Sequence, residues 1–164
     1  EALRRATAAA VARAVAAAGG RVVPDANLHV TLAFLGGVPA ERVADAIAAA
    51  RRVPAVRGVQ AFDRVAQWGR GGPLVLEASR LDPGLQDLQA ALSEALAAAG
   101  FALDRRAFRP HITLSRRPDR RVPPEPPDTE RGVLAWPFAG FVLVESETAA
   151  AGSRYTVVER FGAN

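Results

Sequence analysis

The chain has 164 residues and a mass of 17.2 kDa, with 49% hydrophobic and 23% charged residues. This size predicts one domain or two small lobes around a shared core, and the composition excludes a disordered chain. The absence of cysteine excludes disulfide scaffolds and thiolate metal sites. The net charge is +4, and all the basic side chains other than histidine are arginines, which permits a phosphate-bearing or RNA partner.

The first half of the chain predicts two helices with a strand between them. Residues 1–18 are Ala-rich with apolar side chains at helical spacing, and Gly19-Gly20 ends this helix. An extended piece at 21–23 and a turn at 24–27 follow. Residues 28–35 (LHVTLAFL) predict a buried strand, and residues 39–52 predict the second helix, with proline in its first turn.

The second half predicts one helix among several strands. Asp82-Pro83 marks the start of the helix and Gly100 its end, and the helix carries four leucines on one face: Leu85, Leu88, Leu92 and Leu96. The predicted strands are residues 59–67, 74–78, 108–116, 133–145 and 154–160.

A short motif, His-x-Thr-Leu, occurs twice. It stands at residues 29–32 and 111–114, and it contains the only two histidines of the chain. Each copy follows a helix, a glycine stop and a short connection. The repeat predicts an α+β fold made of a pseudo-twofold pair of lobes, one around each motif.

The two motifs carry side chains suited to chemistry at phosphorus. Residues i and i+2 of a strand point to the same face, so each histidine shares a face with the threonine of its motif. In-line displacement at phosphorus needs a base, an acid and donors for the other oxygens. Two imidazoles, whose ordinary pKa is near ~6.5, and two hydroxyls can supply these groups without a metal.

Two alternatives compete with this interpretation. A single histidine on an apolar strand is more often a packed core residue, but two matched copies that hold every histidine favour catalysis. A zinc site could combine the histidines with Glu77, Glu145 or Asp104. Zinc sites usually cluster three or four protein ligands, and no local motif supplies the third. We therefore expect no metal and no cofactor.

Residues 22–36 (VVPDANLHVTLAFLG) and 108–116 (FRPHITLSR) closely resemble the two-histidine phosphoesterase superfamily. Within it, the chain is similar to the LigT-like RNA 2′,3′-cyclic phosphodiesterases, also called 2′-5′ RNA ligases, over essentially its whole length. The resemblance implies a single bilobal α+β domain over residues 1–164. In this fold two antiparallel sheets face each other, helices lie outside, and the His-x-Thr strands line a central cleft.

The resemblance also implies the reaction. It is the metal-independent hydrolysis of a ribose 2′,3′-cyclic phosphate to a 2′-phosphate, at an RNA 3′ end or on a nucleotide. His111 would be the base that activates water, and His29 the acid that protonates the departing 3′ oxygen. The assignment of base and acid is less secure than the pair itself.

Further site residues follow from the same resemblance. Thr31 and Thr113 would bind the phosphate oxygens, Arg116 would add a charged donor pair, and Phe34 would stack on the terminal nucleobase. Arg116 and Phe34 each follow their histidine by five residues, so strict alternation would place them on the opposite face of the strand. A bulge or bend near each strand end is therefore required. As alternatives, Phe34 could be a core aromatic and Arg116 a solvated surface residue.

Other functions remain open at this point. The same chemistry run backwards would join RNA ends through a 2′-5′ linkage, and a small cyclic phosphate metabolite could replace RNA as substrate. A non-enzymatic RNA-binding module is the third alternative. No apolar run reaches the ~18 residues of a membrane span, so we expect no membrane partner. The absence of cysteine favours a cytoplasmic location, and we expect a monomer. Family members begin with a strand before the first helix, which this sequence lacks.

Overall fold

The computed structural model describes residues 1–104, 106–149 and 152–162. The described chain combines α-helices with antiparallel sheets, which confirms the predicted α+β class. It divides into two compact units, called unit 1 and unit 2 here. Unit 1 contains Glu1–Thr31, Val59–Leu81 and Arg109–Trp136, and unit 2 contains Leu32–Gly58, Asp82–Phe108 and Pro137–Asn164.

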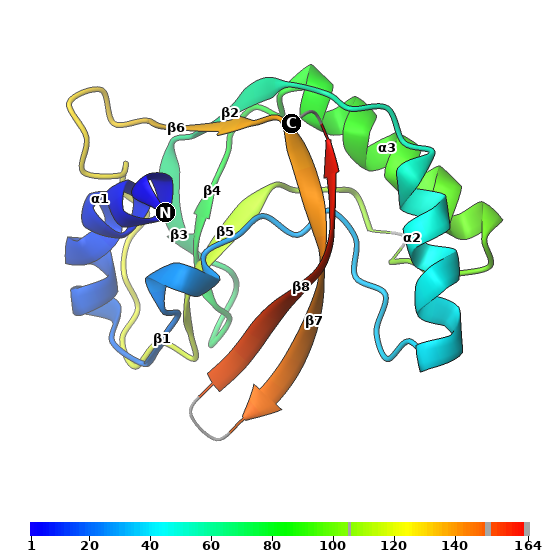
Figure 1. Ribbon diagram of the computed structural model, residues 1–164. Helices are drawn as coiled ribbons and strands as arrows, with labels where there is room; N and C mark the ends of the chain where they lie inside the picture. The colour runs from blue at the N-terminus through cyan, green and yellow to red at the C-terminus, as the bar shows by residue number, and fades with distance from the viewer. Residues whose placement is uncertain (105, 150–151, 163–164) are drawn as a thin grey trace. The chain divides into compact units, whose positions relative to one another are not determined.

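Unit 1 is built on a four-stranded antiparallel sheet with the order β1-β5-β4-β3 (Figure 1). Its strands are β1 (Arg21–Val22), β3 (Arg64–Gln67), β4 (Leu74–Glu77) and β5 (His111–Arg116). The predicted strand at 108–116 therefore begins later, at His111, directly after Pro110. Proline has no amide hydrogen to donate to a ladder, so it stands at the strand boundary.

The hydrophobic core of unit 1 lies between one face of this sheet and helix α1 (Ala2–Ala18). The helix ends at Gly19, whose φ of 65° suits glycine. Small side chains on the buried face of α1 let the helix lie close to the sheet. The core residues are Ala10, Val11, Ala14, Ala18, Leu28, Phe62, Val65, Leu74, Leu76, Ile112, Leu114, Val122 and Leu134.

The predicted strand at 28–35 is wrong. A 3-10 turn at Asp25–Asn27 precedes it, and within the described chain this segment pairs with β5 only at Val30, opposite Ile112. The amides of Asn27 and Leu28 donate to the carbonyl oxygens of Pro24 and Asp25, at 2.8 and 3.1 Å, which closes the turn that the sequence predicts at 24–27.

The predicted strand at 59–67 is divided in two. Strand β2 (Gly58–Phe62) pairs with β6 (Leu134–Phe138), whereas β3 belongs to the four-stranded sheet. Asp63 stands between them and accepts hydrogen bonds from the backbone amide of Ser79, at 2.9 Å, and from its hydroxyl. Its side chain thus stabilises the point where the chain changes sheets.

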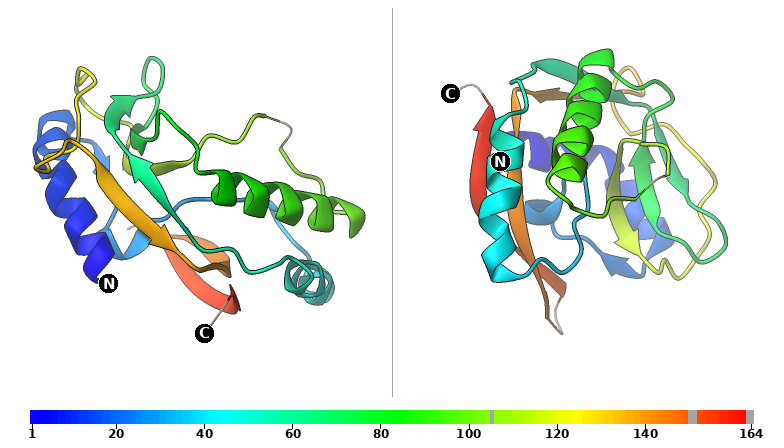
Figure 2. Two further views of the ribbon diagram at one scale, coloured as in Figure 1. Left: turned by 90° about the horizontal axis from the view of Figure 1, so that it is seen from above. Right: turned by 90° about the vertical axis from the view of Figure 1, so that its right-hand side faces the viewer.

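Unit 2 contains two helices and a long hairpin. Helix α2 (Val43–Arg51) follows a 3-10 turn and packs against α3 (Pro83–Ala98). Strands β7 (Gly140–Ala149) and β8 (Gly152–Gly162) pair along their length and twist together (Figure 2). The α3 prediction is confirmed. Asp82 caps the helix by accepting from the amide of Leu85 at 3.0 Å, and the four predicted leucines are buried.

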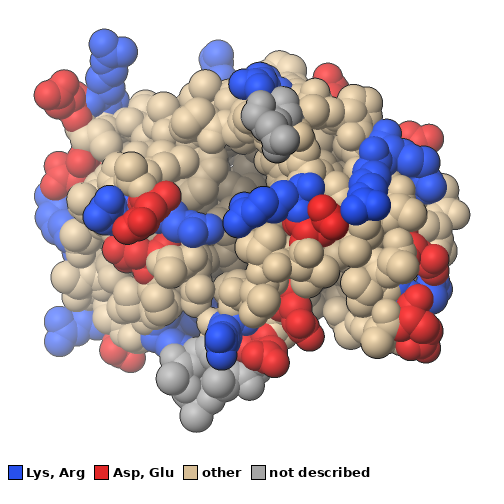
Figure 3. Space-filling model, in the orientation of Figure 1, with Lys and Arg blue, Asp and Glu red and all other residues tan. Residues whose placement is uncertain are grey.

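The surface carries basic and acidic groups side by side on the face shown in Figure 3. Because the chain contains no lysine, every blue side chain there is an arginine. Among the described residues, no helix has both the length and the apolar character needed to cross a membrane.

Candidate active site

The site begins with the bridge between the two motifs. Val30 pairs antiparallel with Ile112, and these two side chains belong to the core on the α1 side of the sheet. Because successive residues of an extended chain alternate between faces, their neighbours project from the opposite face of the sheet. Both motifs therefore present their polar side chains on the face that α1 does not cover.

The antiparallel register also decides which polar side chains are neighbours. One step from the Val30–Ile112 pair, His29 comes opposite Thr113, and Thr31 comes opposite His111. Directly opposite residues have β-carbons about 4.5–5.5 Å apart, and diagonal ones about 7–8 Å. On this register we expect the four side chains to form a quadrilateral with the histidines on one diagonal and the threonines on the other. All four are exposed or half-buried.

Both histidines and both threonines lie in unit 1, whereas Leu32, at the end of the first motif, begins unit 2. The two histidines thus lie within one unit, each next to a residue of the Val30–Ile112 bridge. One lobe around each motif stays a prediction.

Both imidazole rings are held in the same manner. The Nδ1 of His29 lies 2.6 Å from the carbonyl oxygen of Asn27, and the Nδ1 of His111 lies 2.8 Å from that of Arg109. A carbonyl oxygen only accepts hydrogen bonds, so each Nδ1 carries the proton. In the neutral ring the lone pair then belongs to Nε2. Each histidine is therefore in the tautomer that can take a proton at Nε2.

Arg116 lies at the end of β5, beyond a β-bulge. The register between β4 and β5 shifts there, because Val75 pairs with Thr113 whereas its neighbour Leu74 pairs with Ser115. The extra residue in β5 is Leu114, and both it and Ser115 are buried. Because the bulge adds one residue to β5, Arg116 lies on the same face of the sheet as Thr113. The sheet thus has the bulge that the sequence required for this arginine, which is exposed.

Phe34 lies in unit 2 and has 73% of its surface exposed. It is therefore not a core aromatic, which was the alternative interpretation. An exposed aromatic ring is available for stacking.

Sequence reasoning missed a polar cluster beside His111, on the same face of the sheet. Glu77 of β4 pairs directly with His111 and is only 5% exposed. Its carboxylate accepts from Arg64 Nε and Trp68 Nε1, each at 2.7 Å, and from a terminal nitrogen of Arg109 at 3.2 Å. The one sequence signal was an acidic residue that closes the apolar strand LVLE.

The surroundings of Glu77 are those of an ion-paired carboxylate. In the part of the chain that the structure describes, no group of three or more His, Asp or Glu side chains is placed to hold a metal ion. Instead, two guanidinium groups and an indole N–H surround the buried charge, which removes the cost of leaving it unpaired. With two arginines to one glutamate, this cluster has a net positive charge.

The chain is similar to known proteins in both sequence and structure. A family model described as the 2′-5′ RNA ligase superfamily matches residues 3–145. The RNA 2′,3′-cyclic phosphodiesterase of Thermus thermophilus is 35% identical over 159 residues, covering 87% of this chain and 75% of the relative. The enzyme of the same name from Escherichia coli is 34% identical over 144 residues, covering 87% and 79%. The crystal structure of E. coli LigT in its apo form matches with a TM-score of 0.84 at 30% identity, covering 98% of this chain and 90% of that one. These matches confirm the resemblance inferred from the two motifs.

Proposed function

The chain belongs to the 2′-5′ RNA ligase superfamily, and on this premise we propose that it hydrolyses RNA 2′,3′-cyclic phosphates to 2′-phosphates. The observation that supports this most is the Val30–Ile112 bridge, because it sets two imidazoles and two hydroxyls on the sheet face that α1 does not cover. A phosphate placed at the centre of these four groups has a histidine on each of two opposite sides, as in-line displacement requires. RNA 3′ ends or nucleotides with a cyclic phosphate are the proposed substrates.

The proposed mechanism uses the histidines in opposite protonation states. Neutral His111 accepts a proton from water at Nε2 while the water oxygen forms a bond to phosphorus. The bond from phosphorus to the ribose 3′ oxygen breaks, and protonated His29 donates its Nε2 proton to that oxygen. The carbonyl groups of Asn27 and Arg109 support these roles, because they keep each ring in the required tautomer.

The remaining residues are assigned to the substrate. Thr31 and Thr113 donate hydrogen bonds to the non-bridging oxygens, where negative charge increases in the transition state. Arg116 adds a charged donor pair, and Phe34 stacks on the terminal base. Two observations support these assignments: Arg116 lies on the same sheet face as Thr113, and the Phe34 ring is exposed.

The testing experiment uses an oligonucleotide that ends in a 2′,3′-cyclic phosphate. The purified protein is expected to convert it to the 2′-phosphate, with unchanged rates in EDTA because the proposed steps use only protein side chains. A 3′-phosphate product, or inhibition by EDTA that zinc reverses, would contradict the mechanism. Binding without turnover would favour the RNA-binding alternative. Joining to an added 5′-hydroxyl RNA, in preference to hydrolysis, would favour the ligase alternative.

A further inference from the structure

The polar cluster beside His111 forms a closed ring of contacts. The Trp68 indole lies against the His111 imidazole, with ring centroids 4.3 Å apart and planes inclined by 50°. Trp68 Nε1 donates to Glu77 Oε2, and the same oxygen accepts from Arg109. The carbonyl oxygen of Arg109 accepts from His111 Nδ1, which closes the ring. The His111 imidazole is thus held by a hydrogen bond at Nδ1 and by contact of its ring with the Trp68 indole.

The guanidinium of Arg109 also contacts the Trp68 indole. Its carbon atom lies 4.9 Å from the centre of the Trp68 ring, so the indole contacts both a guanidinium and an imidazole. Such contacts are favourable because the aromatic face is electron-rich. Trp68 is therefore restrained by Glu77 at its N–H and by Arg109 through its ring.

Glu77 makes this arrangement hard to explain as stabilisation alone. Replacing a buried ion pair with apolar residues is often neutral or stabilising, because burial of charge is costly. The buried carboxylate lies directly opposite a proposed catalytic histidine, and its Oε2 binds both residues that contact that histidine. A role in orienting the His111 ring explains why a charged side chain is kept in this buried position.

We propose that Trp68 and Glu77 are positioning residues that fix the orientation of the His111 ring for proton transfer. Glu77 orients the indole and Arg109, and these two orient the imidazole through its ring and its Nδ1. Neither residue needs to contact the reacting atoms. The assignment rests on the proposed function, because it takes His111 as the base.

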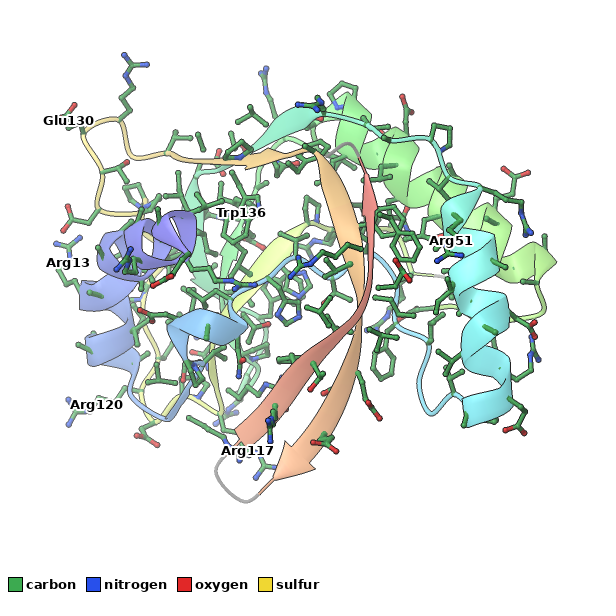
Figure 4. All side chains as sticks on the ribbon, in the orientation of Figure 1. Arg13, Arg51, Arg117, Arg120, Glu130 and Trp136 are labelled. Atoms are coloured by element: carbon green, nitrogen blue, oxygen red, sulfur yellow. The ribbon has the colours of Figure 1, made fainter. Side chains whose placement is uncertain are left out.

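A spectroscopic test examines the contact without using activity. The chain has two tryptophans, and Trp136, labelled in Figure 4, packs edge-on against Phe62 at 6.3 Å. In Trp136→Phe the emission therefore comes from Trp68 alone. An imidazolium in contact with an indole quenches its fluorescence, so acidification that protonates the imidazole should lower the emission.

Two further substitutions identify the quencher. Glu77 and Arg109 contact the indole and imidazole rings or bind to them, and Arg64 binds Glu77. His29 is the other histidine of the chain. The pH response should disappear in Trp136→Phe/His111→Asn and persist in Trp136→Phe/His29→Asn. A response that survives the His111 substitution, or no response in Trp136→Phe, would overturn the proposal. If Trp136→Phe does not fold, the difference between wild type and Trp68→Phe gives the same signal.

A kinetic test examines the positioning role. Trp68→Phe keeps an aromatic face but lacks the N–H, and Glu77→Gln removes the charge that binds both neighbours. Each is expected to lower kcat by up to about 100-fold, because small misplacements of a catalytic group are costly, with KM close to wild type. Trp136→Phe, the matched control, should keep both constants. A raised KM with unchanged kcat would show that Trp68 binds the nucleobase instead. Absence of turnover in the wild type would refute the proposed function but leave the fluorescence result valid.

Discussion

The two copies of the His-x-Thr-Leu motif have the same residues but different frameworks. His111 and Thr113 lie in β5, opposite Glu77 and Val75 of β4, and Glu77 is a buried ion-paired carboxylate. His29 and Thr31 lie in an irregular segment after a 3-10 turn, beside one isolated bridge. Yet both histidines use the same hydrogen bond, from Nδ1 to the carbonyl oxygen two residues earlier. The hydrogen bond that orients the imidazole is thus common to both copies, whereas the secondary structure around the histidine differs.

The largest expected effect tests whether the two copies are equal in chemistry. His29→Ala and His111→Ala should each lower hydrolysis of a cyclic-phosphate substrate by about 10²–10⁴-fold, since each removes a proton-transfer group. Substrate affinity should change little. The measurement is single-turnover kinetics together with equilibrium binding. Full activity in either variant would show that the copies are not a catalytic pair.

The threonines offer a second comparison between the copies. Thr31→Val and Thr113→Val should each lower kcat by as much as about 10²–10³-fold, the usual loss when a donor to a developing oxyanion is removed. Thr→Ser at each position is the control, because it keeps the hydroxyl and should retain most activity. If valine is tolerated at one position only, that threonine does not bind the phosphate.

Backbone hydrogen exchange measures the difference in framework directly. The amides of β5 are in a sheet, whereas residues 28–31 have few ladder bonds, so exchange should be slower in β5 than in the segment around His29. Mass spectrometry of peptides that cover the two motifs separates these signals. Equal protection in both segments would contradict the asymmetry described above.

The smallest effect concerns Asp63, at the junction of β2 and β3. Burial raises the pKa of Asp63, but hydrogen bonds from Ser79 and the nearby Arg64 charge outweigh it, so its pKa is lowered. A lowered pKa means that ionised Asp63 stabilises the fold above its ordinary pKa, and that this contribution is lost as the pH falls through the lowered value.

Asp63→Asn is therefore expected to reduce the free energy of unfolding by about 1 kcal/mol at neutral pH, since it weakens charge-assisted hydrogen bonds. The difference from wild type should shrink in acid, below the ordinary pKa of the carboxyl group. Urea unfolding at several pH values measures it, and activity at neutral pH is the control. A difference that grows in acid would contradict the sign.

The sequence predicted well those elements whose signals are local. In α3 the cap, the proline and the leucine spacing all lie within one segment, and each agrees with the structure. The segment 28–35 has equally strong apolar character, but a strand also needs pairing partners, and this segment pairs with β5 only at Val30. The residue pattern of one segment carries no information about its partners.

For the site, the motifs predict four polar side chains on one sheet face, and the structure adds the Val30–Ile112 bridge that sets their register. The quadrilateral and the bulge at Leu114 depend on the register between segments far apart in sequence. The cluster of Trp68, Glu77 and Arg109 was missed for the same reason, because these residues meet only through the pairing of β3, β4 and β5. The roles of Arg116 and Phe34 stay predictions.

The central claim is that two imidazoles act on one phosphate in opposite protonation states, and the pH dependence of kcat/KM tests it most directly. The wild type should give a bell-shaped profile over the pH range in which imidazole titrates. His111→Ala should remove the fall on the acidic side, and His29→Ala the fall on the alkaline side, each at a much lower rate. If both variants keep both limbs of the bell, the two histidines are not the acid and base of the reaction.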